Sequence, residues 1–394
     1  MIFLALIYLA FISLGLPDSL LGSAWPIMNA EFGVPVGNAG FVSILISGCT
    51  IISSLFSHRL IRRFGTGRVM VASVAMTALA LLGFSLAPSF SWLPVFAVPL
   101  GLGAGAVDAG LNEFVAEHYE AKHMNWLHCF WGVGAMLGPA LLSALVQSGR
   151  AWRSGYFSIA MIQFALVALL FFSLPMWRKR ERPALLPAKA GKAIRDKKGL
   201  LAPMHARGAT FALLTFFLYS SAEGSMTLWA ASFLVKMKSV SPESAAGWVS
   251  LFFLGITAGR MIGGFASMKI RNAAMIRLGA LLALFGFGLM LLPLPAPFAI
   301  AALCLTGLGL APIFPSMLHQ TPLNFGQEHA QAAMGLQMAA AYTGSTFMAP
   351  LFGQLFDRVS FALMPGVLLA CLALLFICTE RLALISERGP AYGE

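Results

Sequence analysis

Charged residues are scarce in this chain of 394 residues. Asp, Glu, Lys and Arg make up 10% of it, whereas soluble domains carry about 25%. Hydrophobic residues make up 59%, and the polar stretches are too short to form a sizeable soluble domain. This composition excludes an ordinary soluble protein and predicts a protein of the membrane.

Cysteine is scarce as well, and motifs for catalysis are missing. The five cysteines fall in apolar segments without metal-ligand spacing, so we interpret them as packing residues. The sequence has no paired metal ligands, no nucleophile elbow and no phosphate-cradling glycine loop. We therefore expect neither an enzyme nor a bound metal or cofactor.

Long apolar runs recur along the whole chain. Crossing about 30 Å of hydrocarbon takes roughly 20 helical residues, and we identify twelve runs that suffice. They predict an all-α membrane protein with twelve transmembrane helices. The expected spans are residues 2–29, 38–57, 68–87, 92–117, 124–147, 154–177, 209–236, 243–266, 272–293, 295–320, 330–352 and 359–380.

Positive charge is distributed unevenly. A net charge of +11 would make nucleic acid a candidate partner of a soluble protein. Most of the 26 Lys and Arg, however, lie in the loops and tail on the N-terminal side of an even number of spans. The positive-inside rule then predicts a multi-pass protein of the plasma (bacterial inner) membrane with both termini cytoplasmic. We expect contact with the lipid bilayer and none with nucleic acid. The sequence is compatible with a monomer but leaves the oligomeric state open.

Two short repeats indicate that the chain consists of two related halves. SILISGCT at 43–50 matches SLFFLGIT at 250–257 in Ser, Gly and Thr, and GLGAGAVD at 101–108 matches GLGLAPIF at 307–314. Both pairs fall at equivalent spans of the two halves. We predict an N-terminal six-helix bundle at 1–177, a basic cytoplasmic linker at 178–208, and a C-terminal six-helix bundle with a short tail at 209–394.

Four charged side chains stand out within the apolar spans: Asp18, Asp108, Glu223 and Arg260. An ionised group costs several kcal/mol in hydrocarbon unless it faces a cavity or a partner, so such residues usually mark function. A carboxylate in a poorly solvating environment is tolerated when it is protonated, and it is useful when substrate and membrane side change its protonation. Arg260 is expected to be the counter-ion of one acid, although the sequence does not indicate which.

Polar residues share helical faces with the first two acids. Asp18 lies on one face with Trp25, and Pro17 is expected to loosen the helix beside it. Asp108 and Asn112 are one turn apart, and a carboxylate next to a carboxamide suits the recognition of hydroxyl groups. These faces are candidates for a substrate site.

Further polar candidates lie in three other spans. They are Asn125 and His128 in span five, Tyr219, Glu223 and Trp229 in span seven, and Gln337 and Tyr342 in span eleven. His128 is placed either to donate a hydrogen bond or relay a proton, or simply to pack between helices. Because Asp18 and Glu223 take nearly equivalent places in the two halves, we expect both to line one internal cavity.

The stretches LPDSLLG around Asp18, GLGAGAVDAGLNEFV around Asp108 and NWLHCFWGVGA around His128 resemble motifs of one family. They are similar to helices one, four and five of the fucose permease (fucose:proton symporter) group in the major facilitator superfamily. SAEGSMTLW, AGRM and APIFPSML are similar to later stretches, so the resemblance covers most of the chain. It implies the major facilitator fold, with Asp18 as the proton-linked aspartate and Asp108 in place of the functional glutamate. Glu223 stands where the group has a neutral glutamine.

These features together predict a secondary active transporter that works by alternating access and couples the symport of a sugar or similar small polar metabolite to protons. Asp18 and Asp108 are expected to take up and release the proton. The residues expected to bind substrate are Trp25, Asn112, Asn125, His128, Tyr219, Glu223, Trp229, Gln337 and Tyr342. The alternative is a proton-linked exporter of amphipathic drugs or lipids, for which the 32 Phe and 20 Met are suited, although lipid-facing packing accounts for them equally.

Overall fold

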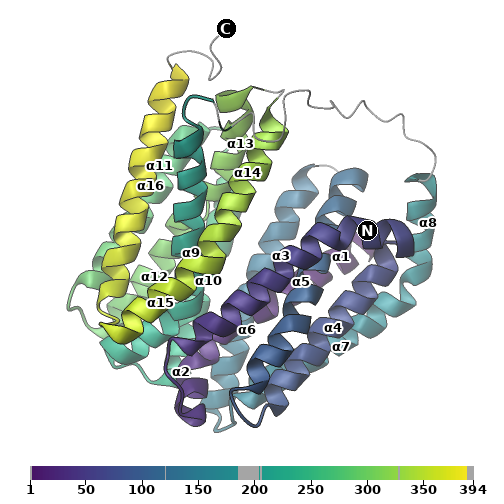
Figure 1. The fold of residues 1–394 in the computed structure, drawn as a ribbon, viewed down its shortest axis with the longest axis horizontal. Helices are drawn as coiled ribbons and strands as arrows, with labels where there is room; N and C mark the ends of the chain where they lie inside the picture. The colour runs from purple at the N-terminus through teal and green to yellow at the C-terminus, as the bar shows by residue number, and fades with distance from the viewer. Residues whose placement is uncertain (1, 120, 185–203, 205, 327–328, 388–394) are drawn as a thin grey trace. The chain divides into compact units, whose positions relative to one another are not determined.

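Every regular element in the described part of this computed structural model is a helix (Figure 1). The structure describes all residues except 1, 120, 185–203, 205, 327–328 and 388–394, so most of the expected linker lies outside it. The prediction of an all-α protein is confirmed. The physical reason is that only internally hydrogen-bonded backbone is tolerated in hydrocarbon, and a helix supplies every bond within one segment.

The first half of the chain, as described, begins with a broken helix. Its helices are α1 (Ile2–Asp18), α2 (Leu20–Phe32), α3 (Asn38–Phe64), α4 (Thr66–Leu86), α5 (Trp92–His118), α6 (Ala121–Gln147), α7 (Arg153–Phe172) and α8 (Leu174–Ala184). Together α1 and α2 form the first expected span.

The second half contains two further interrupted spans. Its elements are α9 (Ala209–Lys238), α10 (Pro242–Ala266), α11 (Asn272–Leu291), α12 (Ala296–Leu310), α13 (Ile313–Phe325), α14 (Ala330–Thr343), the π-helical segment η2 (Gly344–Met348), α15 (Ala349–Arg358) and α16 (Leu363–Glu387). The tenth span consists of α12 and α13, and the eleventh of α14, η2 and α15.

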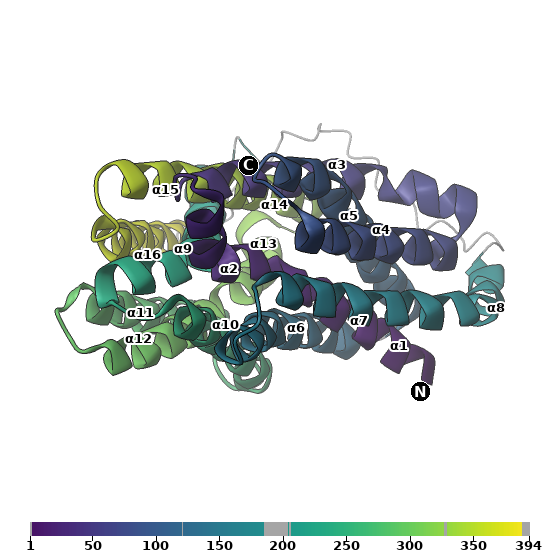
Figure 2. The same ribbon diagram turned by 90° about the horizontal axis from the view of Figure 1, so that it is seen from below.

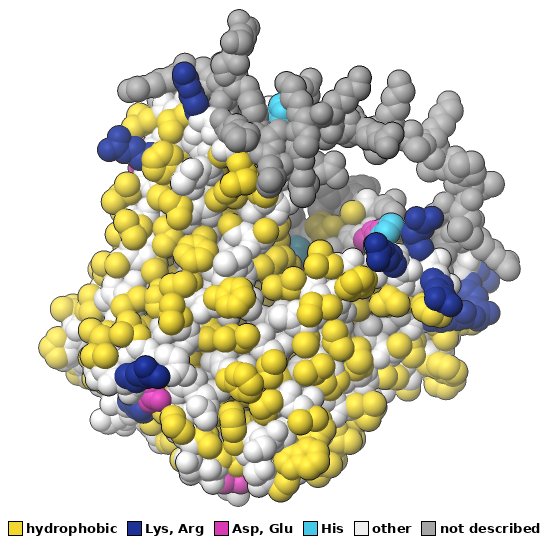
Figure 3. Space-filling view, in the orientation of Figure 1, with side chains coloured by type: hydrophobic (Ala, Val, Ile, Leu, Met, Phe, Trp, Pro, Cys, Tyr) yellow, Lys and Arg dark blue, Asp and Glu magenta, His cyan; other side chains and the backbone are white. Residues whose placement is uncertain are grey.

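Among the described residues, ten helical stretches are long and apolar enough to cross a membrane. The two other expected spans, 209–236 and 330–352, are also helical, as α9 and as α14 to α15. They are less apolar because α9 carries Glu223 among several serines and the eleventh span carries glutamines. A face visible in the space-filling view is covered largely by hydrophobic side chains (Figure 3), as lipid contact requires.

The chain groups by contact into two compact units. The first unit comprises the helices through α8 together with Leu228–Phe253, and the second comprises the remaining residues. Both α9 and α10 are thereby divided between the units. The bundle boundaries expected near residues 177 and 209 therefore stay a prediction.

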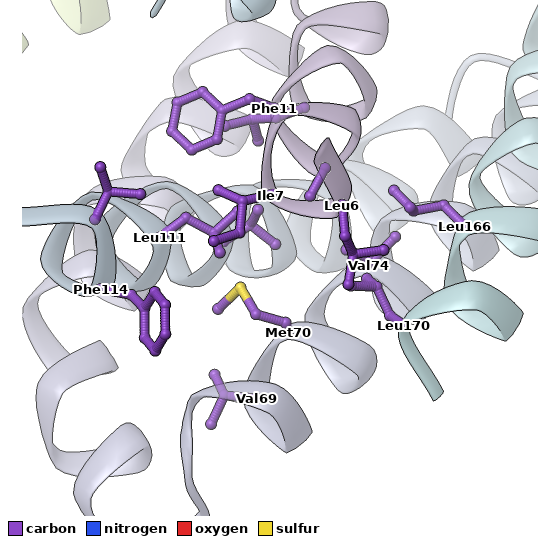
Figure 4. Close-up of a cluster of buried hydrophobic side chains, with 14 of the residues drawn as sticks. Leu6, Ile7, Phe11, Val69, Met70, Val74, Leu111, Phe114, Leu166 and Leu170 are labelled. Atoms are coloured by element: carbon purple, nitrogen blue, oxygen red, sulfur yellow. The ribbon is translucent and has the colours of Figure 1, made fainter. Parts of the chain in front are cut away.

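In the first unit, α1 packs along α6, α3 along α5, and α4 against α5 and α7 (Figure 2). Side chains from α1, α4, α5 and α7 form its apolar core (Figure 4). The labelled members are Leu6, Ile7, Phe11, Val69, Met70, Val74, Leu111, Phe114, Leu166 and Leu170. Lipid tails are as apolar as these side chains, so the hydrophobic effect does not drive helices together in the membrane. Close van der Waals packing of this kind holds them together instead.

Glycines let α1 and α6 touch backbone to backbone. A Cβ on Gly134 would lie 2.0 Å from the carbonyl oxygen of Ile12, and one on Gly15 would lie 2.1 Å from that of Trp131. Only glycine fits at such distances. The close approach fixes the position of α6 along α1, and therefore which α6 side chains reach the end of α1.

In the second unit, α11 packs against α12, α13 and α16. The π-helical segment approaches α9 through Gly344, whose Cβ would lie 2.3 Å from the carbonyl oxygen of Phe217. This contact lies one turn before Ser221 and nearly two turns before Glu223. The helix that carries the second-half acid is thus held by a glycine contact, as is the helix that carries Asp18.

Candidate functional site

Asp18 lies at the break between α1 and α2. It is the last residue of α1, the chain turns at Ser19, and α2 follows. The Asp18 side chain is exposed, and its Oδ2 accepts a hydrogen bond of 2.6 Å from Nε1 of Trp131 on α6. Ser19 Oγ donates to the carbonyl oxygen of Ala135, also on α6, at 2.7 Å. One helix therefore holds both residues of the break.

Asp108 and Asn112 form a joined pair on α5. Nδ2 of Asn112 donates to both the carbonyl oxygen and Oδ1 of Asp108, each at 2.9 Å. Both residues are half-buried, and the Asn112 Oδ1 has no hydrogen-bond partner within the described residues. Asp108 is close enough to act electrostatically on Asp18. The first unit thus places two carboxylates within electrostatic range of each other.

The second unit contains a separate charged cluster. An Arg260 guanidinium nitrogen lies 3.6 Å from Oε1 of Glu223, and both side chains are largely buried, with exposed fractions of 17% and 22%. Tyr219, one turn before Glu223, is buried and interacts electrostatically with both charges. The counter-ion question left open by the sequence is answered here, because Glu223 is an acid partner of Arg260.

Three expected substrate residues are buried in helix packing. Trp25 is fully buried, and its Nε1 donates to the carbonyl oxygen of Val36 at 2.6 Å. Trp229 is fully buried as well. The buried Gln337 accepts a hydrogen bond of 2.8 Å from Thr321 Oγ1. The hydrogen bond of Trp25 reaches the turn before α3, and that of Gln337 joins α14 to α13, so neither bond reaches an acid.

The other candidates are more accessible. His128 on α6 is exposed and meets the ring of Phe11 edge-on at 6.0 Å. Tyr342 in α14 is 38% exposed. The side chain of Asn125 lies outside the described residues. His128 therefore combines exposure with a place on the helix that holds Asp18.

Sequence reasoning missed two partners of the α1 break. Trp131 lies one turn after His128 on α6, but that spacing relates it to His128 and does not indicate a contact with Asp18. Gln163 is a lone carboxamide in an otherwise apolar stretch of α7. Because polar residues are rare in membrane spans, this position alone could have indicated that Gln163 has a partner on another helix. It is buried and hydrogen-bonded to α1 and α4. Within the described residues, no group of three or more His, Cys, Asp or Glu is arranged to hold a metal ion.

Helices long and apolar enough to cross a membrane, the first span interrupted at an acid held by a neighbouring helix, define a multi-pass membrane protein. The model of the Major Facilitator Superfamily matches residues 7–347, so the chain belongs to this superfamily. This confirms the predicted fold, a twelve-helix membrane protein, and the family resemblance.

Relatives of known function include transporters of different solutes. The chain is 22% identical to the glucose/mannose transporter GlcP of Bacillus subtilis (strain 168), over 91% of this chain and 89% of that protein. It is 25% identical to the 3-(3-hydroxy-phenyl)propionate transporter of Escherichia coli (strain K12), over 83% and 81%.

Solved structures share the fold over nearly the whole chain. A D-xylose-proton symporter matches with a TM-score of 0.72 and 15% identity, covering 95% of this chain and 96% of that one. The transporter FucP in its outward conformation matches with a TM-score of 0.63 and 15% identity, covering 96% and 98%. At this identity the likeness concerns the fold.

Proposed function

We propose that the protein is a proton-coupled symporter of a sugar or similar small polar metabolite that works by alternating access in the plasma membrane. The observation that carries the proposal is the geometry of Asp18. An exposed carboxylate sits at a break in a membrane helix, is held by one indole N–H, and lies within electrostatic range of a second carboxylate.

This arrangement suits reversible protonation. The Trp131 N–H stabilises the ionised form of Asp18, whereas the nearby Asp108 charge disfavours two ionised carboxylates at once. Exposure gives Asp18 access to water. We therefore assign proton uptake and release to Asp18 and Asp108, with the two Asn112 hydrogen bonds fixing the orientation of Asp108.

Hydroxyl recognition is assigned to polar groups that are exposed, or that are buried with a free hydrogen-bonding position or beside a charge. Asn112 has a buried oxygen without a partner in the described part of the chain, and His128 and Tyr342 are exposed. We also assign Asn125 and the cluster of Tyr219 and Glu223 to substrate binding. Relatives named for glucose, mannose and D-xylose support a sugar. Packing accounts for the buried Trp25, Trp229 and Gln337.

A second candidate substrate class is a small organic acid. The observation that favours it is Arg260, a cation largely buried in a span where it interacts with Glu223 across 3.6 Å. A substrate carboxylate would compete with Glu223 for this cation. The relative named for 3-(3-hydroxy-phenyl)propionate, a hydroxylated acid, supports this class.

The test begins with the purified protein and a thermal-shift panel of monosaccharides, hydroxylated aromatic acids and cationic amphiphiles. Stabilisation by a sugar selects the first candidate, stabilisation by an acid the second, and stabilisation by amphiphiles alone contradicts both. The stabilising compound is then offered to reconstituted vesicles with an inward proton gradient.

We expect concentrative uptake that collapses when the gradient is dissipated. Asp18→Asn should lose proton-driven accumulation while still exchanging substrate across the membrane, because the amide cannot carry the proton. Glu243→Gln, which removes a carboxylate in the first turn of α10, is the matched control and should behave as wild type. Full proton-driven uptake by Asp18→Asn would remove Asp18 from coupling.

A further inference from the structure

Gln163 on α7 is a buried carboxamide that joins three helices. Its Nε2 donates to the carbonyl oxygen of Ser13 on α1 at 2.9 Å, and its Oε1 accepts a hydrogen bond from Thr77 Oγ1 on α4. The residue is 1% exposed. A polar group so deep in an apolar span is costly unless it is hydrogen-bonded, and here both ends of the amide are.

The Ser13 carbonyl is available because of Pro17. In an α-helix a carbonyl accepts from the N–H four residues later, and that residue here is a proline without an N–H. The proline ring also crowds the carbonyl of residue i−4. Gln163 therefore supplies the hydrogen bond that Pro17 removes.

Pro17, whose missing N–H is replaced by the amide of Gln163, directly precedes Asp18. Asp18 ends α1, and its carboxylate must reach Nε1 of Trp131 on α6. The end of α1 is consequently held from two sides, by α6 through Asp18 and Ser19 and by α7 through Ser13. The bond from α7 thus adds to the close backbone contact of α1 with α6 in fixing the segment between Ser13 and Asp18.

The interior beside this contact is mostly apolar and contains a small cavity. A cavity of about 10 Å³, about the space of one water molecule, is lined in part by Ser13, Pro17, Thr77 and Gln163. The buried Ser13 hydroxyl has no hydrogen-bond partner in the part of the chain that the structure describes. Packing at this point is therefore incomplete, and the hydrogen bonds of Gln163 add to the contacts that fix α1.

We propose that Gln163 is a positioning residue for Asp18, which by holding the Ser13 carbonyl keeps the break in α1 in the geometry that couples proton movement to substrate movement. This proposal rests on the proposed role of Asp18 in proton coupling. Gln163 itself contacts neither substrate nor the exchanged proton; it acts through the backbone of α1.

The test is a double-mutant cycle between Gln163 and Pro17. Gln163→Met keeps the size of the side chain and removes both hydrogen bonds. Pro17→Ala returns the N–H that the Ser13 carbonyl lacks. In the wild-type background, Gln163→Met should lower proton-driven uptake about tenfold, a factor that one lost hydrogen bond commonly gives. In the Pro17→Ala background, the same change should cost less than about twofold, because the helix satisfies Ser13 itself.

A readout beyond stability separates positioning from folding. Substrate exchange without a gradient should remain close to wild type in Gln163→Met, so that the ratio of driven uptake to exchange falls. Thr77→Val is the matched control, because it leaves Gln163 Oε1 unpaired but keeps the bond to Ser13. It should lower the melting temperature without changing the ratio.

The outcomes are distinct. A wild-type ratio in Gln163→Met, or an equal cost in both backgrounds, overturns the proposal. If Gln163→Met does not fold, its yield should recover in the Pro17→Ala background, and failure to recover overturns the proposal too. A loss of driven uptake in Asp18→Asn together with a normal Gln163→Met overturns only the role of Gln163. Full driven uptake in Asp18→Asn overturns both proposals.

Discussion

Asp18 and its indole partner illustrate how a membrane helix accommodates an acid. The carboxylate is exposed, and one charge-assisted hydrogen bond from Trp131 fixes its direction. Glu223 is accommodated differently, by a cation 3.6 Å away and with most of its surface covered. The two acids occupy nearly equivalent places in the sequence, yet the first is open and the second is ion-paired.

Trp131→Phe removes the indole N–H that reaches Asp18 and keeps an aromatic ring at this position. Because a hydrogen bond to a charged group is worth about 1.5–3 kcal/mol and this carboxylate is partly solvated, we expect a loss of about tenfold in proton-driven uptake. The measurement is initial uptake in vesicles with a set proton gradient. Trp126→Phe, an exposed tryptophan on the same helix, is the control and should retain the wild-type rate. Equal rates in the two variants would contradict the assigned role of Trp131.

Glu223 and Arg260 should be coupled in stability. Removing one charge leaves the other largely buried without its counter-ion, so Glu223→Gln and Arg260→Met should each lower the melting temperature in detergent. The double variant should recover part of the loss, with a coupling of about 1 kcal/mol because both groups keep some solvent. Strictly additive losses would show that the pair does not interact.

At the scale of elements, each half contains a close glycine contact between two of its own spans, and these spans are equivalent in the two halves. Gly101 on α5 approaches the Ile46 carbonyl on α3, and Gly255 on α10 approaches the Cys304 carbonyl on α12. These are spans two and four, and spans eight and ten, the spans whose sequences repeat. The repeat in the sequence thus corresponds to a repeated helix contact, although the glycine lies on the fourth span in one half and on the eighth in the other.

Gly134→Ala tests the close contact of α1 with α6. The added methyl would lie 2.0 Å from a backbone oxygen, which cannot move aside as a flexible side chain can. We expect a loss of stability of about 1–3 kcal/mol, and reduced uptake because the contact also places Trp131. Gly48→Ala on α3, where nothing lies within 4 Å, is the control and should be neutral. Thermal unfolding in detergent measures both; a neutral Gly134→Ala would contradict the assigned contact.

At the scale of the whole molecule, charge distribution predicts orientation. In a multi-pass protein with short connecting loops, the loops that are rich in Lys and Arg lie on the cytoplasmic side of the membrane. We propose that both termini are cytoplasmic, which places the α6–α7 connection outside and the α10–α11 connection inside.

Single cysteines in these two connections test the orientation. Ser148→Cys and Ser267→Cys are both exposed positions. In intact cells, a membrane-impermeant thiol reagent should label Ser148→Cys, and it should label Ser267→Cys only after permeabilisation. Wild type, whose five cysteines lie in apolar segments, provides the background. The reverse labelling pattern would show that the positive-inside interpretation is wrong.

Some features of the site were predictable because they are rare in hydrocarbon. Asp18, Asp108 and Glu223 stand out in apolar runs, and the pairing of Asp108 with Asn112 follows from helical spacing alone. The partner of Asp18 was not predictable in this way. Trp131 is 113 residues away, and aromatic residues are common in such spans. Trp25 shares a helical face with Asp18, but the structure buries its indole against Val36.

Composition and periodicity by themselves determined that this chain is all-helical, crosses the membrane repeatedly and carries acids where acids need a function. Those properties follow from the free energy of transferring residues and segments into lipid. That free energy depends on the residues of each segment itself and not on its neighbours in the fold. The tertiary structure alone decided that Gln163 replaces the hydrogen bond lost at Pro17, that Trp131 holds Asp18 and that Arg260 pairs with Glu223. These contacts join helices distant in sequence, and they depend on which glycines let two backbones meet.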